Sequence, residues 1–434
     1  MNLLVTNTRN GQAYGIIRAL RPYAQKVVVT MEGDNRFVAR LSHAANSRLV
    51  DERYYAPSPA QDWRAGRIQK ENTVVEEAYI QAVLRICERE QIDTVFPSFD
   101  PHIYVLSKNK ERFERLGILI PIPDYEKVIT PLDKYRTILA AEEIGFPCPK
   151  TFLPESEDCL RRIAEEVGFP LVIKPRLSAG SRGMEIATEF RELADKYRLV
   201  IKTQGLPMVQ EYIPGNQRQN IYLTLDKKGE LKSVFCPKTH RVFLRIYRNS
   251  SGVSESSDPH PFLVYAARLA HRLKWWGGIT IQTKVDQRDG VPKLMEINPR
   301  LGTHLWYRTE LGINEPLICL NIAREQEVEA AKDYPVGKML LEPVEEAIGV
   351  MVGFLDLLIY KFRTRLLGKI PIDPFNKPTS FGEIIQSYRQ TYFNGKEKIF
   401  NPYFSYFFQD PLVSLLWWLA FLKYVVRASK QIGR

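Results

Sequence analysis

The sequence has few cysteines, and their spacing excludes the sites and scaffolds that cysteines usually build. Only five occur among 434 residues, and no two of them form a CxxC pair. Neither a zinc knuckle nor a disulfide framework is therefore indicated, and a reducing compartment fits best. The five are Cys87, Cys148, Cys159, Cys236 and Cys319.

Targeting and low-complexity segments are also missing. The N-terminus, MNLLVTNTRNGQ, has no basic start and no apolar stretch long enough for a signal peptide, so we expect synthesis in the cytoplasm. No internal repeat is visible. The apolar fraction of 44% and the charged fraction of 26% are ordinary for a globular protein. A chain of 434 residues then predicts two or three domains.

Positive charge and aromatic residues gather at the C-terminal end. The net charge is +11, and from residue 351 onward twelve Lys and Arg face five Asp and Glu, so 12 − 5 = +7 lies there. The same stretch holds eighteen of the 48 aromatic residues. This change of composition predicts a boundary near residues 340–350.

The N-terminal third alternates strand and helix patterns, which favours a doubly wound parallel sheet. Gly11 and Gly15 follow the first strand, but the G-x-G-x-x-G spacing is absent and no acidic residue closes the second strand at Thr30, so NAD is not indicated. Asp100 follows a strand, where it either contacts a ligand or caps a helix. The predicted elements are strands at Leu3–Thr6, Val27–Thr30 and Thr94–Pro97, and helices at Gln12–Leu20 and Val74–Glu90.

The middle of the chain contains a loop suited to phosphate. After a helix at Asp133–Ile144 and another at Cys159–Val167, the buried strand Leu171–Ile173 delivers Lys174 to a loop rich in glycine and serine. Backbone N–H groups of such a loop can surround phosphate oxygens while the lysine supplies charge. A plain hairpin loop with a surface lysine remains the alternative.

Four segments in this order resemble the ATP-grasp superfamily, with most likeness to the subgroup containing biotin carboxylase and carbamoyl-phosphate synthetase. The resemblance spans about residues 1–330, and its most specific element is the run Glu296-Ile-Asn298-Pro-Arg300. The segments are Gly168–Gly183, Met208–Gly215, Gly277–Asp286 and Pro292–Gly302.

The resemblance implies a nucleotide site. Lys174 would hold the α- and β-phosphates, Lys134 would contact ATP from the start of its helix, and backbone groups of 208–215 would read the adenine edge. The family's acidic ribose contact is replaced here by Asn216–Asn220, where Gln217 can still bind a ribose hydroxyl. The implied contacts with ATP are Lys134, Lys174, Gly180, Ser181, Gly183, Gln210, Glu211, Tyr212, Ile213 and Gln217.

A divalent metal site is expected on two paired strands. Residues two apart on a strand share a face, so Glu296 and Asn298 point the same way while Ile297 faces the core. A hairpin can bring Gln282 beside them. One carboxylate and two amide oxygens suit Mg²⁺ or Mn²⁺, which would bridge the ATP phosphates. Arg300 would stabilise the transferring phosphoryl group, unless it merely pairs with Glu296 at the surface.

The expected fold is α/β and α+β in three parts. Residues 1–120 form a doubly wound parallel α/β domain, 121–340 a two-lobed ATP-grasp domain, and 341–434 a basic helical extension. The resemblance implies a Mg²⁺-dependent ligase that activates a carboxylate as an acyl phosphate for attack by an amine or other nucleophile. The alternatives are ATP-dependent carboxylation, carbamoyl-phosphate-type chemistry, or a membrane scaffold that only senses nucleotide.

Two segments are candidates for the substrate site. The basic run 238–248, followed by the polar segment Ser250–Ser257, could bind an acidic substrate, or form an ordinary solvated strand and loop. His304, Trp306 and Tyr307 either face the acceptor or belong to the core. The basic residues of the first segment are Lys238, His240, Arg241, Arg245 and Arg248.

The C-terminal extension has two apolar stretches, Phe354–Leu367 and Pro411–Val426. The second is interrupted by Lys423 and is too short to span a bilayer. Its aromatic and basic residues favour a helix at an anionic membrane surface on the cytoplasmic side, although a helix packed on the body or in a homodimer would have a similar pattern. Nucleic acid is not favoured, because the aromatic residues lie in apolar runs. The membrane-seeking residues are Trp417, Trp418, Phe421, Tyr424, Lys423, Arg427 and Lys430.

Overall fold

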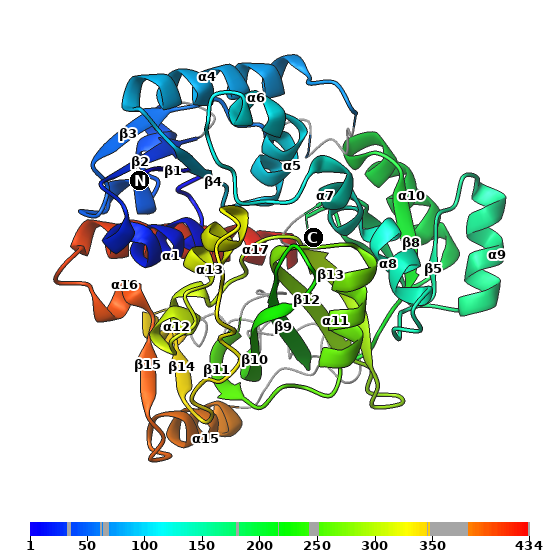
Figure 1. The fold of residues 1–434 in the computed structure, drawn as a ribbon. Coiled ribbons are helices and arrows are strands. Elements are labelled where there is room, and N and C mark those ends of the chain that lie inside the picture. Colours follow the sequence, from blue (N-terminus) through cyan, green and yellow to red (C-terminus); the bar gives the residue numbers. More distant parts are fainter. Residues whose placement is uncertain are drawn as a thin grey trace.

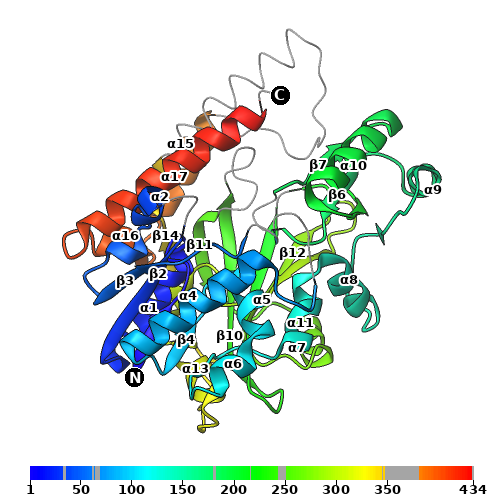
Figure 2. The ribbon, with the colours of Figure 1, turned by 90° about the horizontal axis from the view of Figure 1, so that it is seen from above.

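The structure, a computed structural model, describes residues 1–32, 36–60, 63, 69–178, 182–215, 217–242, 251–344, 346–347 and 381–432. These residues form three sheets, with helices between them and around them (Figure 1). A parallel sheet lies in the N-terminal domain, a small sheet in a separate lobe, and a large sheet between them. The C-terminal segment returns to the N-terminal domain (Figure 2).

The N-terminal sheet is parallel, with strand order β3-β2-β1-β4. Leu4 enters the core cluster beneath α4 and α5, while Leu3 and Val5 enter the cluster on the opposite face with α1. Both faces are therefore covered, as the doubly wound prediction requires. The strands are β1 (Asn2–Val5), β2 (Lys26–Met31), β3 (Glu52–Tyr55) and β4 (Thr94–Phe96); the helices are α1 (Gly11–Leu20), α2 (Arg36–Arg40), α4 (Val74–Glu90), α5 (Asp100–Lys108) and α6 (Lys110–Glu114), with 3-10 turns η1 (Arg21–Tyr23) and η2 (Ala44–Asn46).

Helix α4 has the bounds that the sequence predicts, because its ends carry clear local signals. Thr73 and Glu76 form a capping box at the start, and Gln91 ends the helix in the left-handed conformation. Helix α8 (Lys134–Glu142) is shorter than predicted at both ends: Asp133 is its N-cap and accepts from the amides of Tyr135 and Arg136, and Glu143 is its C-cap.

The small lobe holds the sheet β5-β8-β6-β7. Leu171 and Ile173 of its central strand pack with Val209 against two helices. Lys174 and Pro175 extend that strand beyond its predicted end at Ile173. The elements are β5 (Thr151–Phe152), β6 (Leu171–Pro175), β7 (Glu185–Ala187), β8 (Pro207–Glu211), α9 (Glu157–Val167) and α10 (Phe190–Gln204).

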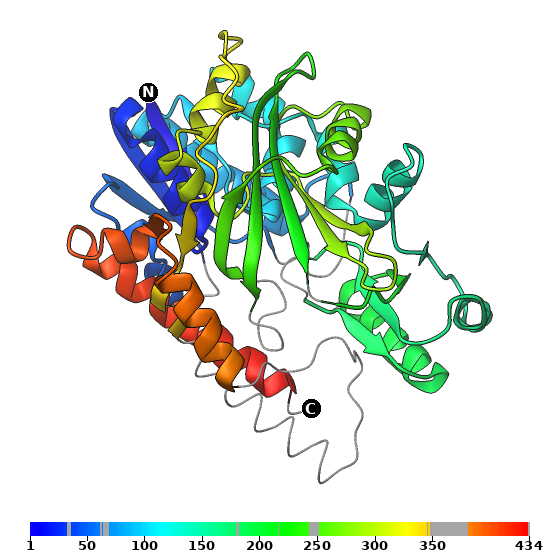
Figure 3. The ribbon, with the colours of Figure 1, turned by 90° about the horizontal axis from the view of Figure 1, so that it is seen from below.

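The large sheet runs in the order β13-β12-β9-β10-β11-β14-β15, and Figure 3 shows its long strands side by side. Only the pair β14 and β15 is parallel among the strands that the structure describes in this sheet. The strands are β9 (Arg218–Leu225), β10 (Leu231–Val242), β11 (Ser251–Ser257), β12 (Gly277–Val285), β13 (Pro292–Asn298), β14 (Met339–Leu341) and β15 (Lys398–Phe400). Its helices are α7 (Tyr125–Leu132), α8, α11 (Leu263–Arg272), α12 (Leu305–Glu310) and α13 (Glu315–Ala323).

The polar segment Ser250–Ser257, expected to be a loop, contains strand β11 instead. Its backbone pairs with β10 on one side and β14 on the other. Because these ladder hydrogen bonds satisfy the backbone, they outweigh the weak strand preference of serine.

The C-terminal segment contributes a strand as well as helices. Strand β15 pairs with β14 at the edge of the large sheet. After it, Asp410 is buried and accepts from the hydroxyl groups of Ser47 and Tyr14, which tie this segment to the N-terminal domain. The helices are α15 (Phe381–Tyr392), α16 (Pro402–Ser405) and α17 (Pro411–Ile432).

The two tryptophans of α17, expected at a membrane surface, are half-buried and pack against protein. Trp417 stacks on Tyr403 with ring centroids 4.6 Å apart, and Trp418 stacks on Phe407 at 5.4 Å. This stacking covers part of the apolar ring surface that, from composition alone, was expected to contact a bilayer. The stretch Phe354–Leu367 lies outside the described residues. Among the helices that the structure does describe, none is long and apolar enough to cross a membrane.

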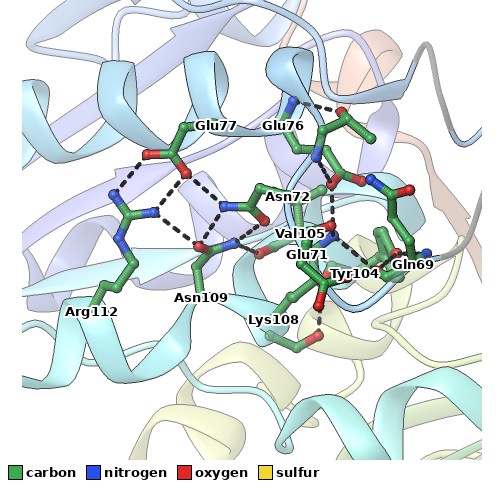
Figure 4. Close-up of polar contacts among 12 residues, drawn as sticks. Gln69, Glu71, Asn72, Glu76, Glu77, Tyr104, Val105, Lys108, Asn109 and Arg112 are labelled. Atoms are coloured by element: carbon green, nitrogen blue, oxygen red, sulfur yellow. Dashed lines mark hydrogen bonds and ion pairs between the residues drawn. The ribbon is translucent and has the colours of Figure 1, made fainter.

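A buried polar network fixes the start of α4 to α5 and α6 (Figure 4). The ammonium of Lys108 donates to the Glu76 carboxylate at 2.6 Å and to the carbonyls of Gln69 and Glu71. The side chains of Lys108 and Glu76 are 5% and 2% exposed. Each charge is thus paired where water does not reach it.

We predict that Lys108→Met destabilises the protein by about 3–5 kcal/mol, because Glu76 would keep a buried charge without its cation. Urea unfolding followed by fluorescence measures this change. Arg115→Ala is the control, since its ion pair with Glu111 is exposed and should contribute nothing measurable. Equal stability of the two variants would show that the network does not hold the domain together.

Candidate active site

Strands β12 and β13 bring together the three oxygen-bearing side chains expected to hold a metal. Gln282 lies directly opposite Glu296 in the antiparallel register, and Asn298 lies opposite Thr280. Ile297 between them is buried in the main core cluster, whereas Glu296 and Asn298 remain partly exposed on the other face. The register therefore places the oxygen ligands at one end of the hairpin, on one side of it.

Lys134 lies beside this face. It is the first residue of α8, and its ammonium donates to the carbonyl of Ser178, near the start of the loop that follows β6. It also lies 3.7 Å from a carboxylate oxygen of Glu296. A lysine at a helix N-terminus is unfavourable for the helix dipole, so these acceptors explain its position.

Lys174 reaches the same region from the small lobe. It is buried and donates to the side-chain oxygen of Gln210 at 2.6 Å, and Gln210 in turn donates to the Thr151 hydroxyl. Burial lowers the pKa of Lys174 to about 7, and the Glu296 carboxylate opposes this shift. A bound anion would be a stronger partner for this ammonium than the neutral Gln210 side chain is.

Two further cations belong to this region, and the sequence analysis missed both. Lys284 and Arg218 also lower the pKa of Lys174, and they lie opposite each other on β12 and β9. The ammonium of Lys284 donates to the carbonyl of Ile213 at 2.6 Å. A signal was available for Lys284, because it stands two residues from Gln282 and so shares its strand face.

The segment expected to contact adenine joins β8 to the large sheet. Ile213 is buried, and Tyr212 lies with its ring centroid 5.2 Å from the Lys284 ammonium. The carboxylate of Glu211 accepts from Arg288 and from the amide of Lys150. The side chain of Glu211 is thus engaged in contacts within the fold.

Arg300 connects the β12–β13 hairpin to the N-terminal domain. It donates to Asp100 at 2.8 Å and to the side-chain oxygen of Asn298 at 3.0 Å. The alternative of a surface ion pair with Glu296 is wrong, since Asp100 is the carboxylate that Arg300 pairs with. The alternative that Asp100 caps a helix is also wrong, because Phe99 is the N-cap of α5.

The hairpin oxygens fit a magnesium ion that arrives with a nucleotide. Among the described residues no group of three His, Cys, Asp or Glu side chains is arranged to hold a metal. Glu296 is the single carboxylate of the expected set, and Gln282 and Asn298 add amide oxygens. Mg²⁺ accepts one or two carboxylates and completes its shell with phosphate oxygens and water, so this donor set is suitable only with such partners.

Other expected residues lie elsewhere. Gly180 and Ser181 are outside the described residues, and Gly183 has a positive φ of 70°. Gln217 precedes β9, where its carbonyl accepts from the amide of Val285 at 2.9 Å. The side chain of Gln217 is exposed.

The proposed acceptor residues are mostly interior. Tyr307 is fully buried and packs with Trp306 in a core cluster. The His304 ring is buried, and one nitrogen lies 3.4 Å from the Tyr222 hydroxyl. Burial lowers the pKa of His304 to about 3, which keeps the ring neutral. The core alternative is thus the better description of this group.

The basic segment at 238–248 is only partly described. Lys238 is exposed, and His240 pairs with Glu255 at 2.7 Å. Arg245 and Arg248 lie outside the described residues, as do the side-chain surroundings of Arg241.

Sequence models of three families match successive parts of the chain. A model described as "PylC-like, N-terminal domain" matches residues 37–121, "Carbamoyl-phosphate synthase L chain, ATP binding domain" matches 133–234, and "ATP-grasp in the biosynthetic pathway with Ter operon" matches 230–345. The second range contains Lys134 and Lys174, and the third contains β12 and β13.

Curated relatives are similar over part of their length. The carbamoyl phosphate synthase large chain of Pseudomonas putida is 26% identical over 163 residues, which cover 36% of this chain and 15% of that protein. The D-alanine–D-alanine ligase of Nitrosospira multiformis is 24% identical over 197 residues, covering 40% and 58%. The chain thus spans well under two thirds of the length of these relatives.

Solved structures match over most of the chain. The biotin carboxylase domain of the 2-oxoglutarate carboxylase of Hydrogenobacter thermophilus, a dimer with MgADP and bicarbonate, has a TM-score of 0.60 at 17% identity and covers 78% of this chain and 73% of its own. The N5-carboxyaminoimidazole synthetase of Staphylococcus aureus has a TM-score of 0.57 at 12% identity, covering 84% and 86%. The resemblance to ATP-grasp proteins is thereby confirmed, and the chain carries the ATP-grasp fold.

Proposed function

We propose that this protein is an ATP- and Mg²⁺-dependent ligase that activates a carboxylate as an acyl phosphate and transfers the acyl group to an amine. The observation that carries the proposal is the meeting of Lys134 with Glu296, 3.7 Å apart, beside Lys174 and Arg300. Cations from the body and the small lobe face the oxygen ligands of the β12–β13 hairpin. Such an arrangement suits a polyphosphate chain with a bound metal.

The proposed reaction has two steps. A carboxylate oxygen of the substrate attacks the γ-phosphorus and ADP leaves; the amine then attacks the acyl carbon and phosphate leaves. Lys174 and Lys134 orient the phosphate chain, and Arg300 stabilises charge on the transferring group. Gln282, Glu296 and Asn298 would hold Mg²⁺, which when bound neutralises phosphate charge. No protein nucleophile is needed.

The relatives include ligases and carboxylases, so carboxylation or carbamoyl-phosphate-type chemistry with bicarbonate is the rival reaction. A nucleotide-sensing scaffold is the rival outside catalysis. We propose a cytoplasmic location, and a homodimer is left open.

We predict that incubation with MgATP, hydroxylamine and a panel of amino acids and sugar acids yields ADP and a hydroxamate with one class of acid. Hydroxylamine captures an acyl phosphate whatever the natural amine is. Glu296→Gln and Asn298→Ala should each abolish product while leaving the circular-dichroism spectrum unchanged, because both remove oxygen ligands of the metal.

Glu143→Gln is the matched control, since Glu143 pairs with Arg272 at the exposed surface. Full turnover by Glu296→Gln would overturn the assignment of this site. ADP release with bicarbonate, but without hydroxamate from any acid, would favour the rival reaction. Binding of MgATP with no release of ADP would favour the sensor.

We predict that MgATP binding takes up a proton at alkaline pH. The pKa of Lys174 is about 7 without nucleotide, so the side chain is largely neutral above that pH. Phosphate favours the ammonium and raises this pKa, so affinity should fall as pH rises from 7 to 9, by at most about tenfold per pH unit. Titration calorimetry in buffers of different ionisation enthalpy measures the uptake.

Lys174→Ala should weaken MgATP binding by about 2–3 kcal/mol and remove the proton uptake, because the buried phosphate contact is lost. The exposed Lys202 lies on α10 in the same lobe, and Lys202→Ala is its control. Unchanged affinity of the Lys174 variant, or equal uptake in both variants, would exclude Lys174 from the phosphate site.

We further propose that α17 associates with anionic membrane surfaces through its leucines. Four leucines spaced along one face are 42–53% exposed, although the helix packs on the N-terminal domain through its other side. The sequence from residue 351 onward, which includes α17, carries +7 of the net charge of +11. Each basic residue near an anionic bilayer contributes about 1 kcal/mol, so apolar and ionic contacts together can hold the protein reversibly. The leucines are Leu412, Leu415, Leu419 and Leu422.

We predict that the protein floats with anionic vesicles, less so at high salt, and not with neutral ones. Leu415→Gln combined with Leu419→Gln should abolish flotation, whereas the exposed Phe393→Ser should not. Point variants are preferable to truncation, because a shortened chain loses β15 and the aromatic stacks. Indifference to anionic vesicles, with dimers in gel filtration that the double variant disrupts, would assign this face to a second copy.

A further inference from the structure

The two lysines proposed to bind phosphate come from different parts of the fold. Lys134 begins α8 on the body, and Lys174 lies on β6 of the small lobe. Their separation depends on how the lobe is held against the body. The contacts at this junction therefore decide whether both lysines can reach one phosphate chain.

An ion pair joins the two parts next to both lysines. The Nε of Arg176, just after β6, lies 3.1 Å from each carboxylate oxygen of Asp133, and the Nη2 of Arg176 donates to the same group. The amide of Lys134 also donates to the carbonyl of Arg176, at 3.1 Å. Lys134 is thus linked to the lobe through its backbone and through its neighbour Asp133.

Asp133 serves both elements at once. Its carboxylate is 1% exposed and accepts from the amides of Tyr135 and Arg136 at the start of α8. A carboxylate so deeply buried is costly unless its oxygens are fully paired. Arg176 supplies the opposite charge, and its planar guanidinium makes parallel hydrogen bonds that fix direction as well as distance. Rotation of the lobe would break these hydrogen bonds.

We propose that Asp133 and Arg176 are positioning residues that set Lys134 and Lys174 at the spacing of one phosphate chain. Neither side chain needs to touch the nucleotide. The inference rests on the proposed nucleotide site, and it predicts an effect confined to ligands that carry phosphates.

The experiment separates the ion pair from the helix cap. Asp133→Ser removes the carboxylate but keeps an N-cap oxygen, and Arg176→Gln removes the charge and the parallel hydrogen bonds. Each variant and the double variant are titrated with MgATP, and with adenosine, which lacks the phosphates. Lys196→Gln is the matched control, because its ion pair with Glu192 lies within the small lobe.

We expect each single variant to raise the Kd for MgATP about tenfold, and the double variant to raise it no further, because the two residues act as one unit. The Kd for adenosine should stay the same, and Lys196→Gln should change neither value. A general loosening of the lobe would weaken adenosine equally and would overturn the inference.

Unchanged MgATP affinity in the single variants, or a roughly hundredfold loss in the double variant, would also overturn it, since the residues would then act separately or not at all. A different result would contradict the proposed function itself. If the wild-type protein does not bind MgATP, the nucleotide site itself is wrong; if it binds and the variants match it, only the positioning role is wrong.

Discussion

The antiparallel register of β12 and β13 is the constraint on which the candidate site depends. Because Gln282 faces Glu296, the oxygen-bearing side chains share one surface and Ile297 fills the core behind them. A slip of one residue would exchange these faces and bury a carboxylate in an apolar cluster. The large energetic difference between the two arrangements makes the register, and therefore the site, a consequence of core packing.

From this hairpin, charge contacts reach every other part of the site. Glu296 lies near Lys134 of α8. Asn298 accepts from Arg300, which in turn pairs with Asp100 at the start of α5 in the N-terminal domain. The small lobe adds Lys174 beside the same carboxylate. Side chains from the N-terminal domain, the small lobe and the body that carries the large sheet therefore compensate one another's charges across the site. Burial lowers the pKa of Lys174, the neighbouring cations Lys134, Lys284 and Arg218 lower it further, and an anion bound among them would stabilise the arrangement.

The sequence was sufficient where local patterns determine structure. The strand that ends near Lys174, the hairpin of Glu296, and α4 with its capping box all follow from periodicity and turn residues. Contacts between distant segments were not predictable in this way. Asp100 and Arg300 are far apart in the chain, and neither residue alone shows that the other is its partner.

Serines and lysines illustrate the same limit. Ser251–Ser257 has little intrinsic preference for a strand, yet two neighbouring strands offer its backbone full hydrogen bonding. The spacing of Lys284 from Gln282 shows only that the two share a strand face, and the fold is what brings Lys284 near Lys174 and the Ile213 carbonyl. Tertiary context thus determines the element in one case and the electrostatic role in the other.

The C-terminal helix shows why composition alone could not separate its two surfaces. Aromatic and basic residues are common both to membrane-binding helices and to helices that pack on a protein. In α17 the tryptophans stack within the fold, while Leu415 and Leu419 on the same helix stay exposed. The stacking anchors the helix, so burying the leucines against a bilayer or a second copy would need no rearrangement of the aromatic core. The membrane hypothesis therefore depends on the leucine face, and the tryptophans that first suggested it provide the rigid support for that face.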